Sequence, residues 1–202
     1  MIKDVYVIDD VVPIDVQDSI EDLLLGDKLP WHFAQDLTRM RKQIKEEKLT
    51  DLSPYLWISF FEHQNNQSNG LMTRKLHPIL DSVCEKLKLP FAKLLQGRTF
   101  MLFPLVEELR KKHVNIHVDT QTEHVVCLYY VNDADGDTIL FDKTTNEVSP
   151  FESHNNQIEF KEVQRISPKK GRCLVFNGNK YHSATSPEKF TRCVVNFNFL
   201  IR

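Results

Sequence analysis

A short extended segment carries two side chains suited to binding a metal ion. His117 and Asp119 are separated by one residue. Successive side chains of an extended strand point to opposite faces, so this imidazole and this carboxylate project to the same side. A third ligand must come from farther along the chain, and His182 is the best candidate because it follows the apolar run at 171–177. Two histidines and a carboxylate with open positions are typical of a mononuclear non-haem Fe(II) site.

The last apolar run of the chain, at 191–201, predicts a strand with one polar face. If that face met solvent, this would be an ordinary half-exposed strand. If it lined a barrel, Arg192 and Asn196 would need a ligand or water to satisfy them, because burying unpaired polar groups is costly. An arginine in such a place is suited to holding a carboxylate through two parallel hydrogen bonds.

The run at 125–131 is apolar on both faces and is therefore expected in the middle of the fold. Tyr130 would place a phenol inside, where it needs a polar partner. A dicarboxylic acid held by Arg192 could provide one.

Helices are predicted only in the N-terminal half. Asp15 is expected to cap a helix that closes at Gly26 in a left-handed conformation. A second helix is predicted from apolar residues at helical spacing between 76 and 87, with Pro78 in its first turn and Pro90 beyond its end.

From residue 98 onward, short apolar runs separated by turn signals replace helical periodicity. Strands are predicted at about 98–106, 114–119, 124–132, 137–142, 158–165, 171–177 and 191–201. This pattern indicates an α+β, mainly β chain: a jelly roll with supporting N-terminal helices. We expect a single domain over 1–202, with a helical and mixed support region at 1–96 and the jelly-roll core at 97–202. The polar connection at 143–157 is a candidate lid or substrate loop.

An ordered set of motifs resembles a known family. It comprises His117-x-Asp119, the run Cys127–Asn132, Gly136-Asp137-Thr138, Pro168–Gly171, His182 and Thr191-Arg192. Over about residues 98–201 this order is similar to the 2-oxoglutarate- and Fe(II)-dependent oxygenases, in a prolyl 4-hydroxylase-like branch that includes short phage-encoded members. One departure is Asp135, which stands where the family has a glycine.

The resemblance implies a double-stranded β-helix and a set of roles. His117, Asp119 and His182 would bind Fe(II) and form the catalytic centre. Arg192 would bind the distal carboxylate of the co-substrate 2-oxoglutarate, and Tyr130 would add a hydrogen bond to it. The same co-substrate pocket would be lined by Thr138 and Asn196. With O₂, such a site decarboxylates 2-oxoglutarate to succinate and hydroxylates a substrate C–H bond.

These residues allow other interpretations. His113 and His117 have a helical zinc spacing, but β-branched neighbours favour a strand. The function expected is hydroxylation of a protein, peptide or amino acid, with proline suggested by the family. Another substrate class, such as a nucleic-acid base or small molecule, remains open. Relatives that act on alkylated nucleic-acid bases usually have a second arginine six residues after the first, where Asn198 stands in this chain. A non-catalytic jelly-roll binder is the third hypothesis, although a binder has no need for three metal ligands.

Composition limits the partners and the cellular location that are expected. A net charge of −2 with mixed signs does not favour nucleic acid as a partner. No apolar segment reaches the length of a membrane span or a signal peptide. The four cysteines lack paired spacing and indicate free thiols in a reducing compartment. The expected location is therefore the cytoplasm, or the host cytoplasm if the chain is phage-encoded. Substrate identity and oligomeric state have no sequence signature here.

Overall fold

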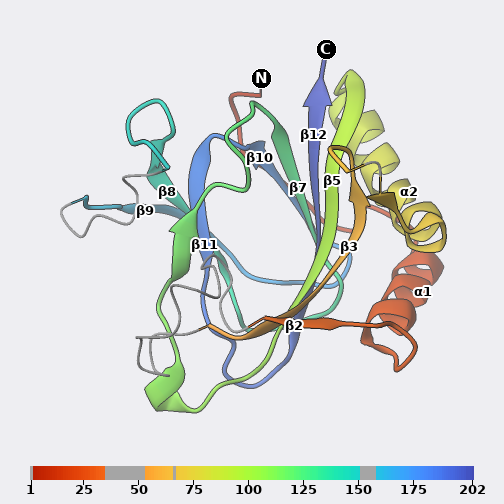
Figure 1. The fold of residues 1–202 in the computed structure, drawn as a ribbon, viewed down its shortest axis with the longest axis horizontal. Helices are drawn as coiled ribbons and strands as arrows, with labels where there is room; N and C mark the ends of the chain where they lie inside the picture. The colour runs from red at the N-terminus through yellow and green to blue at the C-terminus, as the bar shows by residue number, and fades with distance from the viewer. Residues whose placement is uncertain (1, 35–52, 66, 151–157) are drawn as a thin grey trace.

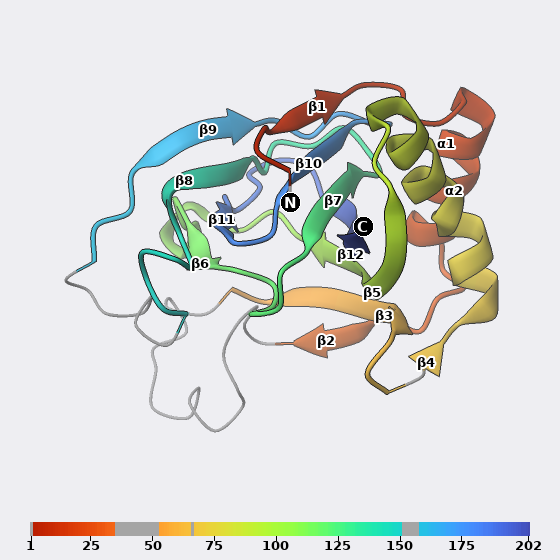
Figure 2. The same cartoon turned by 90° about the horizontal axis from the view of Figure 1, so that it is seen from above.

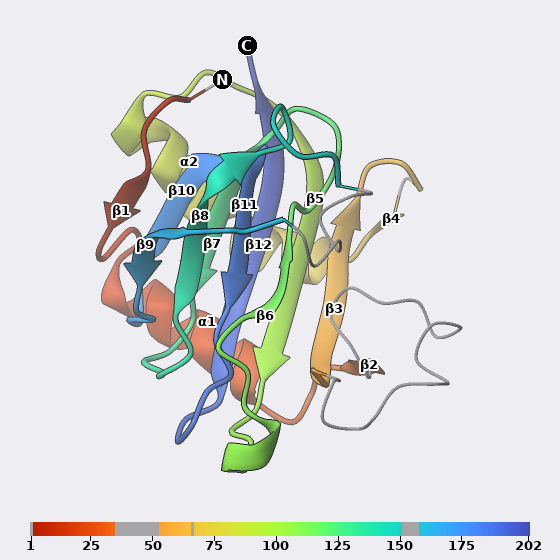
Figure 3. The same cartoon turned by 90° about the vertical axis from the view of Figure 1, so that its left-hand side faces the viewer.

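The computed structural model describes residues 2–34, 53–65, 67–150 and 158–202. Their backbone forms two antiparallel sheets and two helices, arranged in three layers (Figures 1 and 2). Helices α1 (Ile14–Leu25) and α2 (Gly70–Leu87) lie on the outer face of the larger sheet. The smaller sheet lies on the other side of the larger one, as Figure 3 shows with the helices behind both sheets.

The larger sheet has eight strands in the order β1-β10-β7-β12-β5-β3-β2, with β4 paired to β3. The smaller sheet has the order β6-β11-β8-β9. This mainly β double sheet confirms the predicted double-stranded β-helix. The strands are β1 (Tyr6–Ile8), β2 (His32–Ala34), β3 (Tyr55–Glu62), β4 (Gln67–Ser68), β5 (Phe91–Leu102), β6 (Val114–His117), β7 (Val125–Tyr130), β8 (Thr138–Thr144), β9 (Glu162–Ile166), β10 (Cys173–Asn177), β11 (Lys180–Ala184) and β12 (Arg192–Ile201). A 3₁₀ turn, η3 (Glu107–Leu109), follows β5.

Strand β12 shows why the two faces of the larger sheet differ. Its side chains alternate, so Val195 and Phe197 pack in the core beneath the helices, whereas Val194 packs between the two sheets. Arg192 and Asn196 share the face of Val194 and line a cavity between the sheets. The polar face of the strand at 191–201 therefore lines a barrel and does not meet solvent.

Several local expectations were wrong. Helix α1 begins after Pro13 with no side-chain cap, and Asp15 lies within its first turn. Gly26 is extended, with φ −75° and ψ 176°, and does not adopt the left-handed conformation. Helix α2 starts earlier than predicted because the side chain of Asn69 accepts a hydrogen bond from the Met72 amide, which places Pro78 inside the helix.

All four cysteines are free, as predicted; Cys127 and Cys173 contact each other through sulfur atoms 3.8 Å apart. Among the described residues, no helix is long and apolar enough to cross a membrane. Residues 151–157 of the polar connection at 143–157 lie outside the described part of the chain, and its role as a lid stays a prediction.

Candidate metal centre and co-substrate pocket

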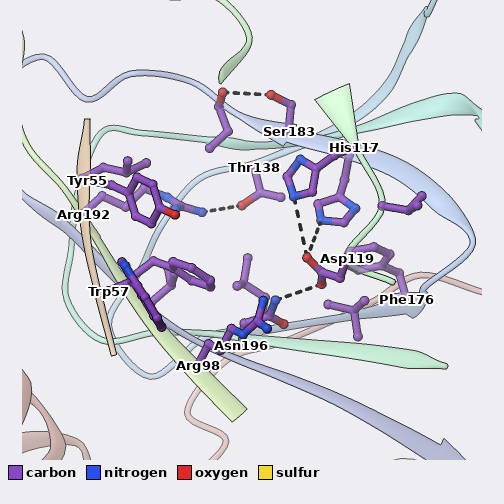
Figure 4. Close-up of a pocket in the computed structure, with 18 of the residues that line it drawn as sticks. Tyr55, Trp57, Arg98, His117, Asp119, Thr138, Phe176, Ser183, Arg192 and Asn196 are labelled. Carbon is purple, nitrogen blue, oxygen red and sulfur yellow. Dashed lines mark hydrogen bonds and ion pairs between the residues drawn. The ribbon is translucent and has the colours of Figure 1, made fainter. Parts of the chain in front are cut away.

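The three predicted metal ligands lie together at one end of the smaller sheet. His117 closes β6 and His182 lies directly opposite it on β11, with ring centroids 4.5 Å apart. Asp119 follows β6 by two residues, and its Oδ1 is 3.6 Å from His117 Nε2 and 3.8 Å from His182 Nε2. One ligand atom from each residue lies within 4.8 Å of the other two. Figure 4 shows both rings directed at this carboxylate oxygen.

The backbone fixes the orientation of both imidazoles. Nδ1 of His117 is 2.8 Å from the carbonyl of Asn115, and Nδ1 of His182 is 3.2 Å from the carbonyl of Lys180. A proton on Nδ1 is donated to each carbonyl, so in the neutral imidazole the Nε2 lone pair is available to a metal ion. Each histidine uses the carbonyl two residues before it. This donor set therefore fits a divalent iron ion, which nitrogen and carboxylate ligands suit.

Without a metal, the charges of this cluster depend on one another. Burial alone would raise the pKa of Asp119, but hydrogen bonds and charge from His117 and His182 outweigh it and hold the pKa well below its ordinary value. Burial disfavours charge on His117, but its hydrogen bond to Asp119 and the charge of that group raise the His117 pKa. Asp119 is therefore ionised and available as an anionic ligand.

Asn196 contacts the far oxygen of Asp119. Its Nδ2 donates to Asp119 Oδ2 at 2.9 Å, so Oδ1 is left facing the two histidines. The sequence predicted Asn196 as a residue of the 2-oxoglutarate pocket. Although it does line the cavity, its hydrogen bond goes to Asp119.

Arg192, Thr138 and Tyr130 form a second, deeper cluster. Arg192 Nη2 donates to Thr138 Oγ1 at 2.8 Å, and the Tyr130 hydroxyl donates to the same oxygen at 2.7 Å. The guanidinium carbon of Arg192 lies 5.6 Å from the centroid of the Tyr130 ring. Burial lowers the pKa of Arg192 and raises that of Tyr130. Arg192 and Thr138 line the cavity, whereas Tyr130 lies fully buried beside them.

Two residues of the 135–138 turn position Arg192. A Cβ at Gly136 would lie only 2.9 Å from Arg192 Cδ, so the close approach of the arginine stem requires glycine. Asp135 accepts backbone hydrogen bonds from residues 188–190, just before β12. Burial alone would raise the pKa of Asp135, but these hydrogen bonds outweigh it and lower the pKa. Asp135 thus holds the loop that leads into Arg192.

The cavity that joins the two clusters has a volume of about 500 Å³. Its walls between the sheets are apolar, and include Val126, Leu128 and Phe176. A further wall comes from strands β3 and β5 and was missed from the sequence: Tyr55, Trp57 and Arg98. The available signal was the alternation of Arg98 with Phe100 and Leu102 on one face of a predicted strand.

Comparison with known proteins agrees with this arrangement. The model of the 2OG-Fe(II) oxygenase superfamily matches residues 105–200. No curated protein sequence matches the chain.

Three solved structures illustrate the structural similarity. The non-haem α-ketoglutarate-dependent epimerase SnoN from nogalamycin biosynthesis has a TM-score of 0.59 at 12% identity, covering 97% of this chain and 77% of SnoN. A Pseudomonas putida prolyl 4-hydroxylase has a TM-score of 0.53 at 12% identity, with coverages of 96% and 91%. HygX from Streptomyces hygroscopicus, solved with nickel and 2-oxoglutarate bound, has a TM-score of 0.54 at 13% identity, with coverages of 96% and 82%. At these identities the similarity concerns the fold.

Proposed function

We propose that this chain is a dioxygenase that hydroxylates a C–H bond of a protein, peptide or amino acid, because the model of the 2OG-Fe(II) oxygenase superfamily matches residues 105–200. The observation that carries the proposal is the convergence of His117 Nε2, Asp119 Oδ1 and His182 Nε2. Proline is the target suggested by the resemblance, and the Pseudomonas putida structure is that of a prolyl hydroxylase. SnoN, an epimerase, shares the fold, so the fold alone does not define the reaction.

Each cluster has a separate task in this proposal. His117, Asp119 and His182 would hold Fe(II), and Arg192 would bind the distal carboxylate of 2-oxoglutarate. When bound, these groups supply the oxidising chemistry, in which one oxygen atom of O₂ enters the substrate and the other enters succinate, with release of CO₂. Thr138 accepts hydrogen bonds from both Arg192 and Tyr130 and so fixes the guanidinium. The apolar walls would limit the access of water once the ligands are bound.

Anaerobic titration with Fe(II) and 2-oxoglutarate tests the metal and co-substrate assignments. The wild-type protein is expected to develop the visible charge-transfer absorbance of a chelated 2-oxo acid. His182→Ala removes one ligand and is expected to lose this band. His113→Ala is the matched control, because His113 lies outside the cluster and contacts Glu162. Retention of the band in His182→Ala would contradict the assigned ligands.

Succinate release tests the substrate class. The panel comprises proline-containing peptides, free amino acids and methylated oligonucleotides, each assayed with and without 2-oxoglutarate. Stimulation by a peptide or an amino acid supports the proposal. Stimulation by oligonucleotides alone would favour a nucleic-acid-directed enzyme, and no stimulation in a protein that binds both Fe(II) and 2-oxoglutarate would favour a binding protein.

A further inference from the structure

Arg98 is a charged residue of the cavity that neither cluster uses. It lies on β5, on the inner face of the larger sheet, where it lines the cavity and its partners on the adjacent strands are Asn196 and Ser59. Arg192 bonds to Thr138 and Asn196 bonds to Asp119, but Arg98 contacts neither group. A charge on the inner face of a central strand is costly. This placement suggests that it meets a ligand.

The register of the sheet places Arg98 at the level of the metal ligands. It pairs with Asn196 of β12, and directly opposed residues have Cβ atoms about 4.5–5.5 Å apart. Asn196 in turn contacts Asp119. Figure 4 shows Arg98 beside Asn196. Arg192 instead pairs with Leu102, four residues farther along β5, which is about 13 Å of strand. The two arginines thus serve different ends of the cavity.

One side of the Arg98 guanidinium is fixed. Nη2 donates to Glu62 Oε2 at 3.1 Å, and Glu62 Oε1 accepts from Gln96 at 3.0 Å. The Glu62 side chain is only 10% exposed, whereas that of Arg98 is 36% exposed. Among the described residues, Glu62 is the only hydrogen-bond partner of this guanidinium. Glu62 therefore orients Arg98, and the planar fork keeps further N–H donors for another acceptor.

The wall beside Arg98 is aromatic. Trp57 on β3 pairs in register with Phe100 on β5, and the Tyr55 ring lies 6.0 Å from that of Phe100. All three residues line the cavity. A ligand in this position would meet a cation at one point and apolar surface around it.

From this geometry we propose that Arg98 binds a carboxylate of the primary substrate, which is an amino acid or peptide with an apolar portion packed against Trp57. The inference rests on the proposed oxygenase function and names its substrate class. The carboxylate could be the α-carboxylate of a free amino acid or the side chain of Asp or Glu in a peptide; the chemistry at Arg98 is the same. Arg98 acts as a specificity-determining residue and leaves 2-oxoglutarate to Arg192.

Two substitutions at the ion pair have opposite expected effects. Arg98→Gln removes the cation and is expected to weaken carboxylate binding at least about tenfold, the scale of a lost charge-assisted hydrogen bond. Glu62→Gln keeps an acceptor for Arg98 but removes the competing negative charge, so carboxylate binding is expected to stay the same or tighten. A purely structural ion pair would be weakened by both substitutions.

Ligand-observed NMR on the anaerobic protein with Fe(II) and 2-oxoglutarate measures the binding of carboxylate ligands directly. The probes are N-acetyl amino acids with free carboxylates, the same compounds as carboxamides, and C-terminally amidated peptides with or without Asp and Glu. The comparison of acids with carboxamides detects recognition of an α-carboxylate. The comparison of peptides with and without Asp and Glu detects recognition of an acidic side chain. We expect binding of carboxylate members in one of the two sets, and loss of that binding in Arg98→Gln.

Controls separate this inference from the proposed function. Arg110→Gln is the matched variant: Arg110 is also paired with a glutamate, Glu188, at a similar side-chain exposure of 32%, but it lies outside the cavity. The double variant Glu62→Gln, Arg98→Gln restores a neutral pair, and its thermal stability and 2-oxoglutarate affinity report folding.

Four results would overturn the role of Arg98: equal binding of amides and carboxylates, no binding by any probe, equal weakening by Arg98→Gln and Glu62→Gln, or loss of 2-oxoglutarate affinity in Arg98→Gln. By contrast, wild-type protein that binds neither Fe(II) nor 2-oxoglutarate would overturn the proposed function itself.

Discussion

One hydrogen bond decides which oxygen of Asp119 faces the two histidines. The amide of Asn196 binds Oδ2, and Oδ1 is left toward His117 and His182. Groups that hold a metal ligand in place commonly contribute 10–100-fold to metal affinity. We therefore propose that Asn196 positions Asp119, and its expected role in lining the co-substrate pocket stays a prediction.

Replacing Asn196 tests this role. Asn196→Ala frees the Asp119 carboxylate to rotate and is expected to weaken Co(II) binding by about tenfold or more. Asn198→Ala is the control, because Asn198 lies two residues away on the same face of β12 and contacts Gln96 instead. Isothermal titration of the metal-free protein measures both affinities. An equal loss in the two variants would show that the strand, and not the contact with Asp119, is responsible.

At the scale of elements, the sequence predicts strands best where both faces are buried. Strand β7 is apolar over its whole length and β10 over all but its last residue, Asn177, and the chain around them supplies clear turn signals. The strand β11 was missed, because Lys180, His182 and Ser183 interrupt its apolar pattern. Its pairing with β6 and β8 stabilises it, and such long-range hydrogen bonds leave no local signature.

The candidate site shows the same limit. His117 and Asp119 share a face in local sequence, so their proximity could be predicted. The position of Arg98 beside Asn196 depends on the pairing of β5 with β12. The histidines are oriented by the backbone carbonyls of Asn115 and Lys180. The sequence does not indicate these contacts, because every residue has a backbone carbonyl.

An ion-pair cluster connects the segment after β1 to the turn before β10. Asp9 accepts hydrogen bonds from Arg172 and Lys169, and these bonds lower its pKa from 3.8 to about 2. A carboxylate whose pKa is lowered on folding stabilises the folded state at pH values above the pKa that it has in the unfolded chain. This stabilisation is present above pH 3.8 and is lost as the pH falls toward 2.

Asp9→Asn should therefore lower the free energy of unfolding at neutral pH. The expected loss is below about 1 kcal/mol, since the Asp9 side chain is partly exposed and solvent screens the pair. The difference from wild type should shrink as the pH falls below 3.8. Urea unfolding across this range measures it, with Asp4→Asn as a control that removes a carboxylate bonded to Tyr6. A difference that does not change with pH would exclude the ion pair as its cause.

At the scale of the molecule, the two sheets contribute different parts of the site. His117 and His182 come from the smaller sheet, whereas Arg192 and Asn196 come from the larger one. Strands β1, β2 and β3 from the N-terminal half extend the larger sheet, so the predicted support region at 1–96 includes strands as well as helices. That the whole chain folds as one domain stays a prediction. Because residues of both sheets line the site, we expect a bound metal ion and co-substrate to contact both sheets.

Ligands that bridge the sheets should stabilise the folded state in two separate steps. A ligand at 100 times its Kd adds about 2.7 kcal/mol, and each kcal/mol corresponds to about 2–4 °C in Tm for a chain of this size. Co(II) should therefore raise the Tm by about 5–10 °C, and 2-oxoglutarate should raise it further. Arg192→Ala should keep the metal step and lose most of the second, because in the proposed function its guanidinium binds the co-substrate and not the metal. Scanning calorimetry measures both steps, and EDTA should reverse them. If Arg192→Ala instead loses the Co(II) step as well, Arg192 supports the metal centre, and the separation of tasks between the two clusters is wrong.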